Sequence, residues 1–146
     1  MRLIAPLTDR ERLGFIAAAR VHSVARTKFK HRGRSEFGID CIGLLAVALA
    51  AVGRVVEDRF RYGRSPEDDR LREAMRLHFG PPIETDPQPA DIALMRWDIR
   101  PQHVALFGDH PQGGLSLIHA DAMFGAVVEH SFAEEWIPRT VEVYRP

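Results

Sequence analysis

The chain has 146 residues, of which 45% are hydrophobic and 27% are charged, as is typical of one globular domain. Its 20 basic and 20 acidic residues give a formal net charge of zero, so the overall charge does not indicate a nucleic-acid partner or an acidic lipid surface. The single cysteine excludes an internal disulfide, and we expect a fold that needs no covalent cross-link.

The N-terminal segment and the longest apolar run bear on where the protein is found. The first ten residues contain too few consecutive apolar residues for the core of a signal peptide. The longest apolar run, residues 42–56, is interrupted by Gly53 and Arg54 and is shorter than a membrane-spanning helix. We therefore expect a protein made in the cytoplasm, without a signal peptide or a membrane span.

A helix followed by a basic segment is predicted near the N-terminus. Thr8-Asp9-Arg10-Glu11 has the form of a capping box, and apolar residues then recur at helical spacing toward Val24. Short charged runs usually lie in solvated loops, but a basic rim beside a site also attracts an acidic substrate. The segment after the helix has no acidic residue until Glu36, and its cationic side chains are Arg26, Lys28, Lys30, His31, Arg32 and Arg34.

The only cysteine, Cys41, lies at the predicted start of a second helix. The glycine-containing approach, Asp40 and the proline-free apolar run to Val52 predict a loop, an N-cap and a helix from Cys41 to about Ala51. Nearly all side chains of this helix are apolar, so we expect it to be buried. The free N–H groups and the dipole at a helix N-terminus favour a thiolate, which is the nucleophilic form. The alternative is that Cys41 is an ordinary buried cysteine.

A third helix and five strands complete the prediction. Ser65-Pro66 has the form of a cap followed by a first-turn proline, and Gly80-Pro81-Pro82 ends this helix. Short β-type runs separated by turn residues follow at residues 92–95, 103–107, 115–119, 125–129 and 140–144. Short connections favour antiparallel neighbours. Helices first and strands afterwards indicate an α+β fold, with an antiparallel sheet of about five strands packed on the buried helix.

Two histidines in consecutive predicted strands suggest chemistry at the cysteine. His103 begins one strand and His119 ends the next, and these ends lie side by side in an antiparallel pair. If the sheet covers the helix that begins at Cys41, the three side chains converge as a nucleophile, a base and a residue that orients the base. Each histidine alone is more often structural, so the hypothesis depends on their combination with Cys41.

Three segments resemble the NlpC-type papain-like cell-wall cysteine peptidases. Gly38-Ile39-Asp40-Cys41-Ile42-Gly43-Leu44 resembles their nucleophile motif, and His103-Val104-Ala105-Leu106-Phe107 resembles their general-base strand. Ile118-His119-Ala120 is similar to the strand that carries their third catalytic residue. A closer resemblance, to the branch found in phage and gene-transfer-agent tails, depends on residues 31–35, residues 127–130, Trp136 and Arg139.

The resemblance implies one NlpC-type peptidase domain over residues 1–146, with a papain-like fold, that hydrolyses peptide bonds in peptidoglycan stem peptides without a cofactor. By position, Cys41 is the nucleophile, His103 is the general base, and His119 is the residue that orients His103. The tail branch also implies other phage-like tail proteins as partners, a place in a virion or tail particle, and action in the periplasm of a recipient cell. The residues predicted to contact substrate are Phe29, His31, Arg34, Asp40 and Trp97.

One position departs from the pattern of these peptidases. Where they usually have a proline-tyrosine pair, this chain has Lys28-Phe29, and phenylalanine lacks the hydroxyl that helps to hold the oxyanion. A tail-tip structural subunit whose peptidase site has lost activity is therefore an alternative to the enzyme.

Two further enzyme classes are alternatives to the peptidase. An amidase or acyltransferase on the same fold would use the same residues, because such a triad determines acyl-transfer chemistry but not the substrate. A zinc hydrolase is less consistent with the sequence, because no short metal-binding spacing occurs and Cys41 would have no role. Its ligands would be His103 and His119 together with Asp109, His110 or His130.

Overall fold

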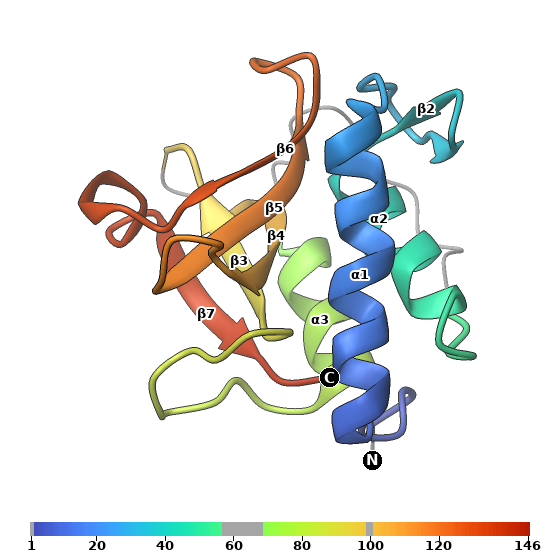
Figure 1. The fold of residues 1–146 in the computed structure, drawn as a ribbon. Coiled ribbons are helices and arrows are strands. Elements are labelled where there is room, and N and C mark those ends of the chain that lie inside the picture. Colours follow the sequence, from blue (N-terminus) through green and yellow to red (C-terminus); the bar gives the residue numbers. More distant parts are fainter. Residues whose placement is uncertain (1, 57–68, 99–100) are drawn as a thin grey trace.

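The computed structural model describes residues 2–56, 69–98 and 101–146. Within these ranges, helices and a five-stranded antiparallel sheet form two layers, with the helices on one face of the sheet (Figure 1). The predicted α+β fold with five antiparallel strands is confirmed. The helices are α1 Asp9–Ala25, α2 Cys41–Ala50 and α3 Arg70–Phe79. The strands of the sheet are β3 Ile92–Arg96, β4 Pro101–Asp109, β5 Leu115–Asp121, β6 Ala126–Ser131 and β7 Thr140–Tyr144.

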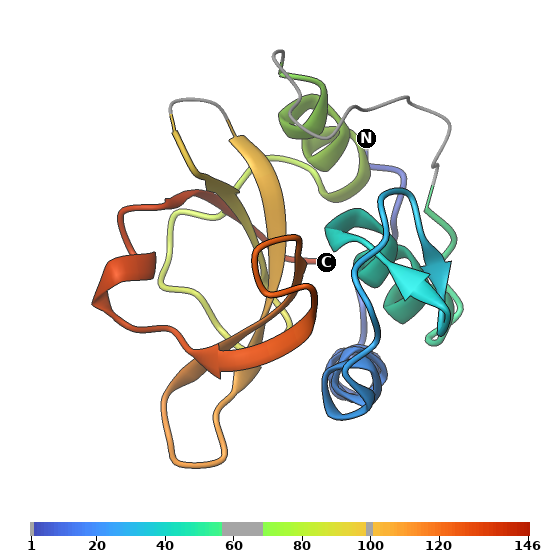
Figure 2. The same ribbon diagram turned by 90° about the horizontal axis from the view of Figure 1, so that it is seen from above.

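The strand order of the sheet is β6-β5-β4-β3-β7, and every neighbouring pair is antiparallel. Strands β3 to β6 are neighbours in chain order, and β7 returns to the opposite edge beside β3. Helix α2 contacts α1, β4 and β5, and α1 also contacts β4, β5 and β6, so the two helices pack side by side against the sheet. Figure 2 shows the curved sheet and the helices as two adjoining halves.

Successive side chains along the strands belong to two different apolar clusters, one on each face of the sheet. Val104 and Ile118 belong to the main core, which also contains the buried apolar residues of α1, α2 and α3. Ala105 and Leu117 point to the other face and pack in a smaller cluster that includes the partly buried Trp136. Successive side chains of a strand point to opposite faces. Residues 103 and 119 therefore share a face with the smaller cluster.

The predicted helix starts are observed where the structure describes them. Thr8 and Glu11 form the reciprocal hydrogen bonds of a capping box at α1, and Asp40 is the N-cap of α2. The predicted start of the third helix at Ser65-Pro66 lies outside the described residues, and α3 ends at Gly80 as predicted. None of the described helices is both long and apolar enough to cross a membrane.

A short hairpin and a 3₁₀ turn were not predicted. The hairpin pairs β1 Arg34–Ser35 with β2 Gly38–Ile39, where the sequence predicts a loop, and its strands are too short to produce an alternating pattern. A Cβ at Gly33 would lie 2.3 Å from the carbonyl oxygen of Gly38, so this close approach requires glycine. The hairpin leads directly into the start of α2. The 3₁₀ turn covers Glu134–Trp136.

Candidate active site

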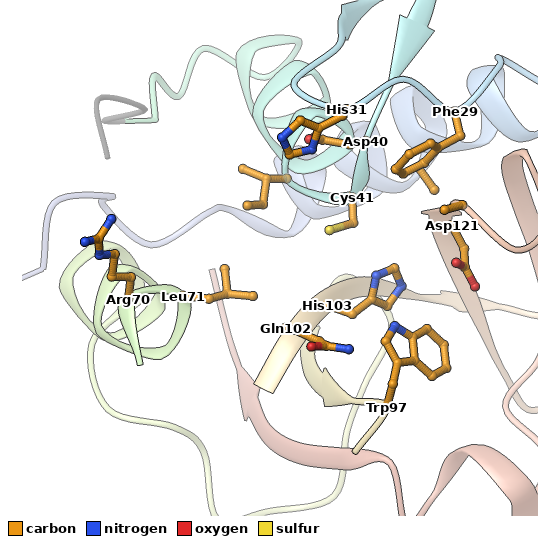
Figure 3. Close-up of a pocket in the computed structure, with 13 residues that line it drawn as sticks. Phe29, His31, Asp40, Cys41, Arg70, Leu71, Trp97, Gln102, His103 and Asp121 are labelled. Atoms are coloured by element: carbon orange, nitrogen blue, oxygen red, sulfur yellow. The ribbon is translucent and has the colours of Figure 1, made fainter. Parts of the chain in front are cut away.

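Cys41 is the first residue of α2 and lines a pocket of about 140 Å³ where the start of this helix meets the start of β4 and the end of β5. His103, from β4, lines the same pocket, and Figure 3 shows the two side chains projecting into it from the helix and from the strand. Phe29, His31 and Trp97 are further lining residues. The structure therefore brings the predicted nucleophile and the predicted base into one cavity.

The Asp40 carboxylate organises the approach to Cys41. One oxygen, Oδ1, accepts hydrogen bonds from the Gly43 N–H at 2.8 Å and from the Arg34 guanidinium at 2.9 Å. The other oxygen, Oδ2, accepts the Arg32 N–H at 2.7 Å. These hydrogen bonds tie the basic segment to the start of α2, and Asp40 itself is only 3% exposed. Of the predicted substrate contacts, Arg34 is absent from the described lining of the pocket and instead forms an ion pair with Asp40.

The start of β4 is separated from β5, and this separation makes room for the cysteine. The β4–β5 pairing runs from Leu106 opposite Ile118 to the far end of the hairpin, and it does not continue to residue 104. The Val104 N–H is therefore available to donate a hydrogen bond to the Cys41 thiol. This contact places the thiol against the segment of β4 that also carries His103.

The pKa of Cys41 differs from the prediction based on its position in the helix. Burial, followed by the negative charge of Asp40, raises the pKa of the thiol to about 12, although hydrogen bonds from the Val104 and Ile42 N–H groups act in the opposite direction. Burial lowers the pKa of His103 to about 3. Both shifts favour an uncharged thiol and an uncharged imidazole in the free protein, in which Cys41 is partly buried and His103 is buried. The sequence revealed the helix start but not the desolvation that opposes it.

The predicted proximity of the two strand histidines is confirmed. Nε2 of His103 lies 2.7 Å from Nδ1 of His119, and the two side chains are 4% and 0% exposed. His119 lies behind His103, outside the described lining of the pocket. Its other nitrogen, Nε2, lies 2.8 Å from Nε2 of His130 in β6, and Nδ1 of His130 lies 2.9 Å from the carbonyl oxygen of Ser131.

Aromatic rings surround these histidines. The Trp97 ring centroid lies 5.2 Å from that of His103, and the Trp136 centroid lies 5.5 Å from that of His119. The two tryptophans contact each other edge to face at 5.7 Å, and the Arg139 guanidinium lies over Trp97. Trp97 thus contacts the candidate base directly. Trp136 and Arg139 belong to the segments that carry the resemblance, but the sequence did not place them here.

The histidine geometry does not fit the zinc hydrolase. The facing nitrogens are separated by 2.7 and 2.8 Å, which are hydrogen-bond distances, whereas nitrogens that share a zinc ion point at a common position about 2.0–2.1 Å from each. Asp109, one of the proposed further ligands, forms an ion pair with Arg20 at 2.9 Å. In the part of the chain that the structure describes, no group of three or more histidine, cysteine, aspartate or glutamate side chains is arranged to hold a metal ion.

The pocket also contains residues that sequence reasoning missed. Gln102, Asp121, Arg70 and Leu71 line it, and Asp121 is buried with one carboxylate oxygen accepting the N–H of Met123. Gln102 directly precedes the predicted base, and Asp121 follows His119 by two residues on the same strand. Their closeness in sequence to His103 and His119 was the signal that could have identified Gln102 and Asp121 as pocket residues. Arg70 and Leu71 come from α3, and no local pattern predicted its packing against the pocket.

Comparison with known proteins supports the fold. No protein-family model matches the chain, and no curated protein sequence matches it. Among solved structures, it is similar to the NlpC/p60 domain of the peptidoglycan hydrolase SagA, with a TM-score of 0.62, 19% identity, and coverage of 92% of this chain and 98% of that domain. It is also similar to an NLP/P60-family protein described as similar to lipoprotein, from Staphylococcus aureus subsp. aureus Mu50, with a TM-score of 0.61 and 13% identity. That match covers 97% of this chain but only 43% of the staphylococcal chain. The chain therefore has the fold of NlpC/P60 domains.

Proposed function

We propose that this chain, which has the fold of NlpC/P60 domains, is a cysteine peptidase that hydrolyses peptide bonds in peptidoglycan stem peptides. The observation that carries the proposal is the shared pocket of Cys41 and His103, with His119 hydrogen-bonded behind the imidazole. A nucleophile, a base and a group that orients the base are thereby arranged in sequence. The likeness to the NlpC/p60 domain of a peptidoglycan hydrolase supports the choice of substrate.

The reaction begins with the uncharged pair. The Cys41 sulfur attacks the carbonyl carbon of the scissile bond as its proton passes to Nδ1 of His103, and the imidazolium then donates this proton to the leaving amine. The resulting thioester is hydrolysed by a water molecule, which His103 deprotonates in turn. Burial lowers the pKa of His103 to about 3, so the imidazole is uncharged at neutral pH and able to accept a proton, although it is a weaker base than an exposed histidine.

Product analysis tests this proposal. Purified peptidoglycan is incubated with the protein, and the released fragments are identified by mass spectrometry. A peptidase generates new amino and carboxyl ends within the stem peptide, whereas an amidase separates the whole stem from the glycan. Fragments cut within the stem support the proposal. Release of intact stems, or transfer of an acyl group to an added amine without hydrolysis, assigns the site to amidase or acyltransferase chemistry instead.

One observation favours an inactive subunit. Phe29 lines the pocket at the position where the resembling peptidases usually carry tyrosine, and it presents no hydroxyl to a substrate oxyanion. Removing one oxyanion donor typically costs about 10²–10³ in rate, so a site without this donor is expected to be slow. An intact Cys41 and His103 in one pocket favour residual activity over complete loss.

The proposal has a second part, which concerns delivery: the protein is a tail component of a phage or gene transfer agent and opens the wall of a recipient cell. Its support is the resemblance of residues 31–35 and 127–130 to the tail branch of these peptidases. Attachment to a particle would raise the effective concentration of the enzyme at the wall. Mass spectrometry of purified particles is expected to find the chain. Particles with Cys41→Ala are expected to assemble and adsorb but to deliver DNA poorly, and particles that lack the chain would contradict this part.

A further inference from the structure

Three histidines and a backbone carbonyl form one continuous chain of hydrogen bonds. It runs from His103 through His119 to His130 and ends on the carbonyl oxygen of Ser131, with separations of 2.7, 2.8 and 2.9 Å. The first two histidines were predicted to cooperate with Cys41. His130, the third histidine, takes no part in the proposed proton transfers.

The last acceptor determines the direction of the whole chain. A carbonyl oxygen accepts hydrogen bonds and cannot donate them, so Nδ1 of His130 must carry the hydrogen. In an uncharged imidazole, Nε2 of His130 is then an acceptor, and Nε2 of His119 must donate to it. Nδ1 of His119 is in turn an acceptor, so Nε2 of His103 donates to it. Nδ1 of His103 is therefore left without a hydrogen.

We propose that His130 is a positioning residue that, together with the Ser131 carbonyl, selects the tautomer of His119 and through it the tautomer of His103. This inference rests on the proposed function, because it assigns to His103 the role of accepting the proton of Cys41. In the opposite tautomer, Nδ1 of His103 carries a hydrogen and cannot accept that proton. The selected tautomer is the one required of a base.

Strand pairing and the surrounding aromatic rings hold the three hydrogen-bonded histidines in place. His119 pairs with Val128 across β5 and β6, so His130, two residues further along, is its diagonal neighbour on the same face of the sheet. The ring centroids of His130 and Trp136 are 4.7 Å apart, with the ring planes tilted by 33°. The ring centroid of Phe124 lies 5.9 Å from those of both His119 and His130.

His119, in the middle of this series of hydrogen bonds, is held uncharged, as the donor and acceptor pattern requires. Burial, the first cause, and the neighbouring His103 and His130 both lower the pKa of His119 well below its usual value. A charged His119 would donate from both nitrogens and would break the alternation of donor and acceptor on which the selection depends. Since His119 is fully buried, a change of its tautomer also leaves an unsatisfied polar atom.

Histidine tautomers in the wild-type protein provide the first test. Protein labelled with ¹⁵N at histidine is examined near pH 7.5 by long-range ¹H–¹⁵N correlation, which distinguishes hydrogen at Nδ1 from hydrogen at Nε2. The expected result is Nε2–H at His103 and His119 and Nδ1–H at His130. Nδ1–H at His103 in the folded wild-type protein overturns the proposal, whatever the enzymatic activity. The failure of this inference is thus distinguishable from the failure of the proposed function.

Two substitutions provide the second test. His130→Leu fills a similar volume without an acceptor, whereas His130→Gln offers Oε1 to the Nε2–H of His119. The leucine variant is expected to show mixed tautomers at His103 and His119 and a kcat reduced by about tenfold or more, but by less than the 10²–10⁴ that a general base contributes. The glutamine variant is expected to restore the single tautomer and most of the rate. A single Nε2–H tautomer with unchanged kcat in the leucine variant would contradict the inference.

Discussion

Nε2 of His103 and Nδ1 of His119 lie 2.7 Å apart, so the candidate base is hydrogen-bonded directly to a fully buried side chain on the next strand. Rotation of the His103 ring would break this contact and leave a buried nitrogen unsatisfied, which costs about 1–3 kcal/mol. The contact therefore holds the imidazole in the orientation in which it faces the pocket of Cys41.

Substitution of His119 tests this orienting role. We expect His119→Ala to reduce kcat but to leave detectable hydrolysis, because an orienting group is less essential than the base itself. His119→Asn is expected to retain more activity than His119→Ala, since its Oδ1 replaces Nδ1 as the acceptor for His103. His103→Ala is the reference for complete loss. Steady-state kinetics on peptidoglycan fragments would contradict the role if His119→Ala were as active as the wild type.

The protonation state of Cys41 provides a second prediction. Because its pKa is raised to about 12, the thiolate population at neutral pH is far smaller than that of a free cysteine with a pKa of about 8.5. Alkylation by iodoacetamide should therefore be slow at pH 7 and should continue to rise beyond pH 10. A plateau reached near pH 9 would contradict the raised pKa.

Asp40→Asn tests one cause of this raised pKa. Asparagine still caps the helix but removes the negative charge beside the thiol, so the pKa of Cys41 should fall and alkylation at a given pH should become faster. Asp40→Ala is the matched control for the cap, and it should reduce the free energy of unfolding by about 0.5–2 kcal/mol. An unchanged alkylation profile in a folded Asp40→Asn protein would remove Asp40 as a cause.

The acid limb of the stability curve provides a third prediction. Burial lowers the pKa of His103 from 6.5 to about 3, so between these values the unfolded chain binds a proton that the folded chain does not. The free energy of unfolding therefore falls as the pH decreases from about 6.5 toward 3. His103→Gln should flatten this slope in urea titrations. Parallel slopes for wild type and His103→Gln would contradict the prediction.

The fold was predictable because its signals are local. The capping box at Thr8, the apolar run after Cys41 and the β-type runs separated by turn residues each define an element within a few residues. The position of His103 at the start of one strand and of His119 near the end of the next also predicted their contact, because antiparallel pairing fixes which strand ends are neighbours.

The remaining features of the site depend on tertiary packing. The raised pKa of Cys41 arises from burial and from Asp40, and sequence periodicity does not indicate how deeply a helix start is desolvated. His130 was considered only as a metal ligand or as part of a resembling segment, because its role depends on the register between β5 and β6. Similarly, Arg34 was predicted to contact substrate, but it lies in the short β1–β2 hairpin, and its guanidinium forms an ion pair with Asp40.

Restoration of a tyrosine tests the consequence of Phe29. Phe29 lines the pocket, so Phe29→Tyr should place a hydroxyl near the substrate carbonyl and raise kcat by about tenfold or more if the site lacks an oxyanion donor. Phe29→Leu is the control for the loss of the ring. A folded Phe29→Tyr protein that cleaves no faster than the wild type would indicate that the oxyanion does not depend on this position.

The proposed hydrolysis depends most on the pairing of Cys41 with His103, and turnover of purified peptidoglycan tests this pairing most directly. Release of stem-peptide fragments is followed over time for the wild type, Cys41→Ala and His103→Ala, with circular dichroism to confirm that each variant is folded. We predict fragment release by the wild type and none by either folded variant. Equal release by Cys41→Ala and the wild type would contradict the central claim.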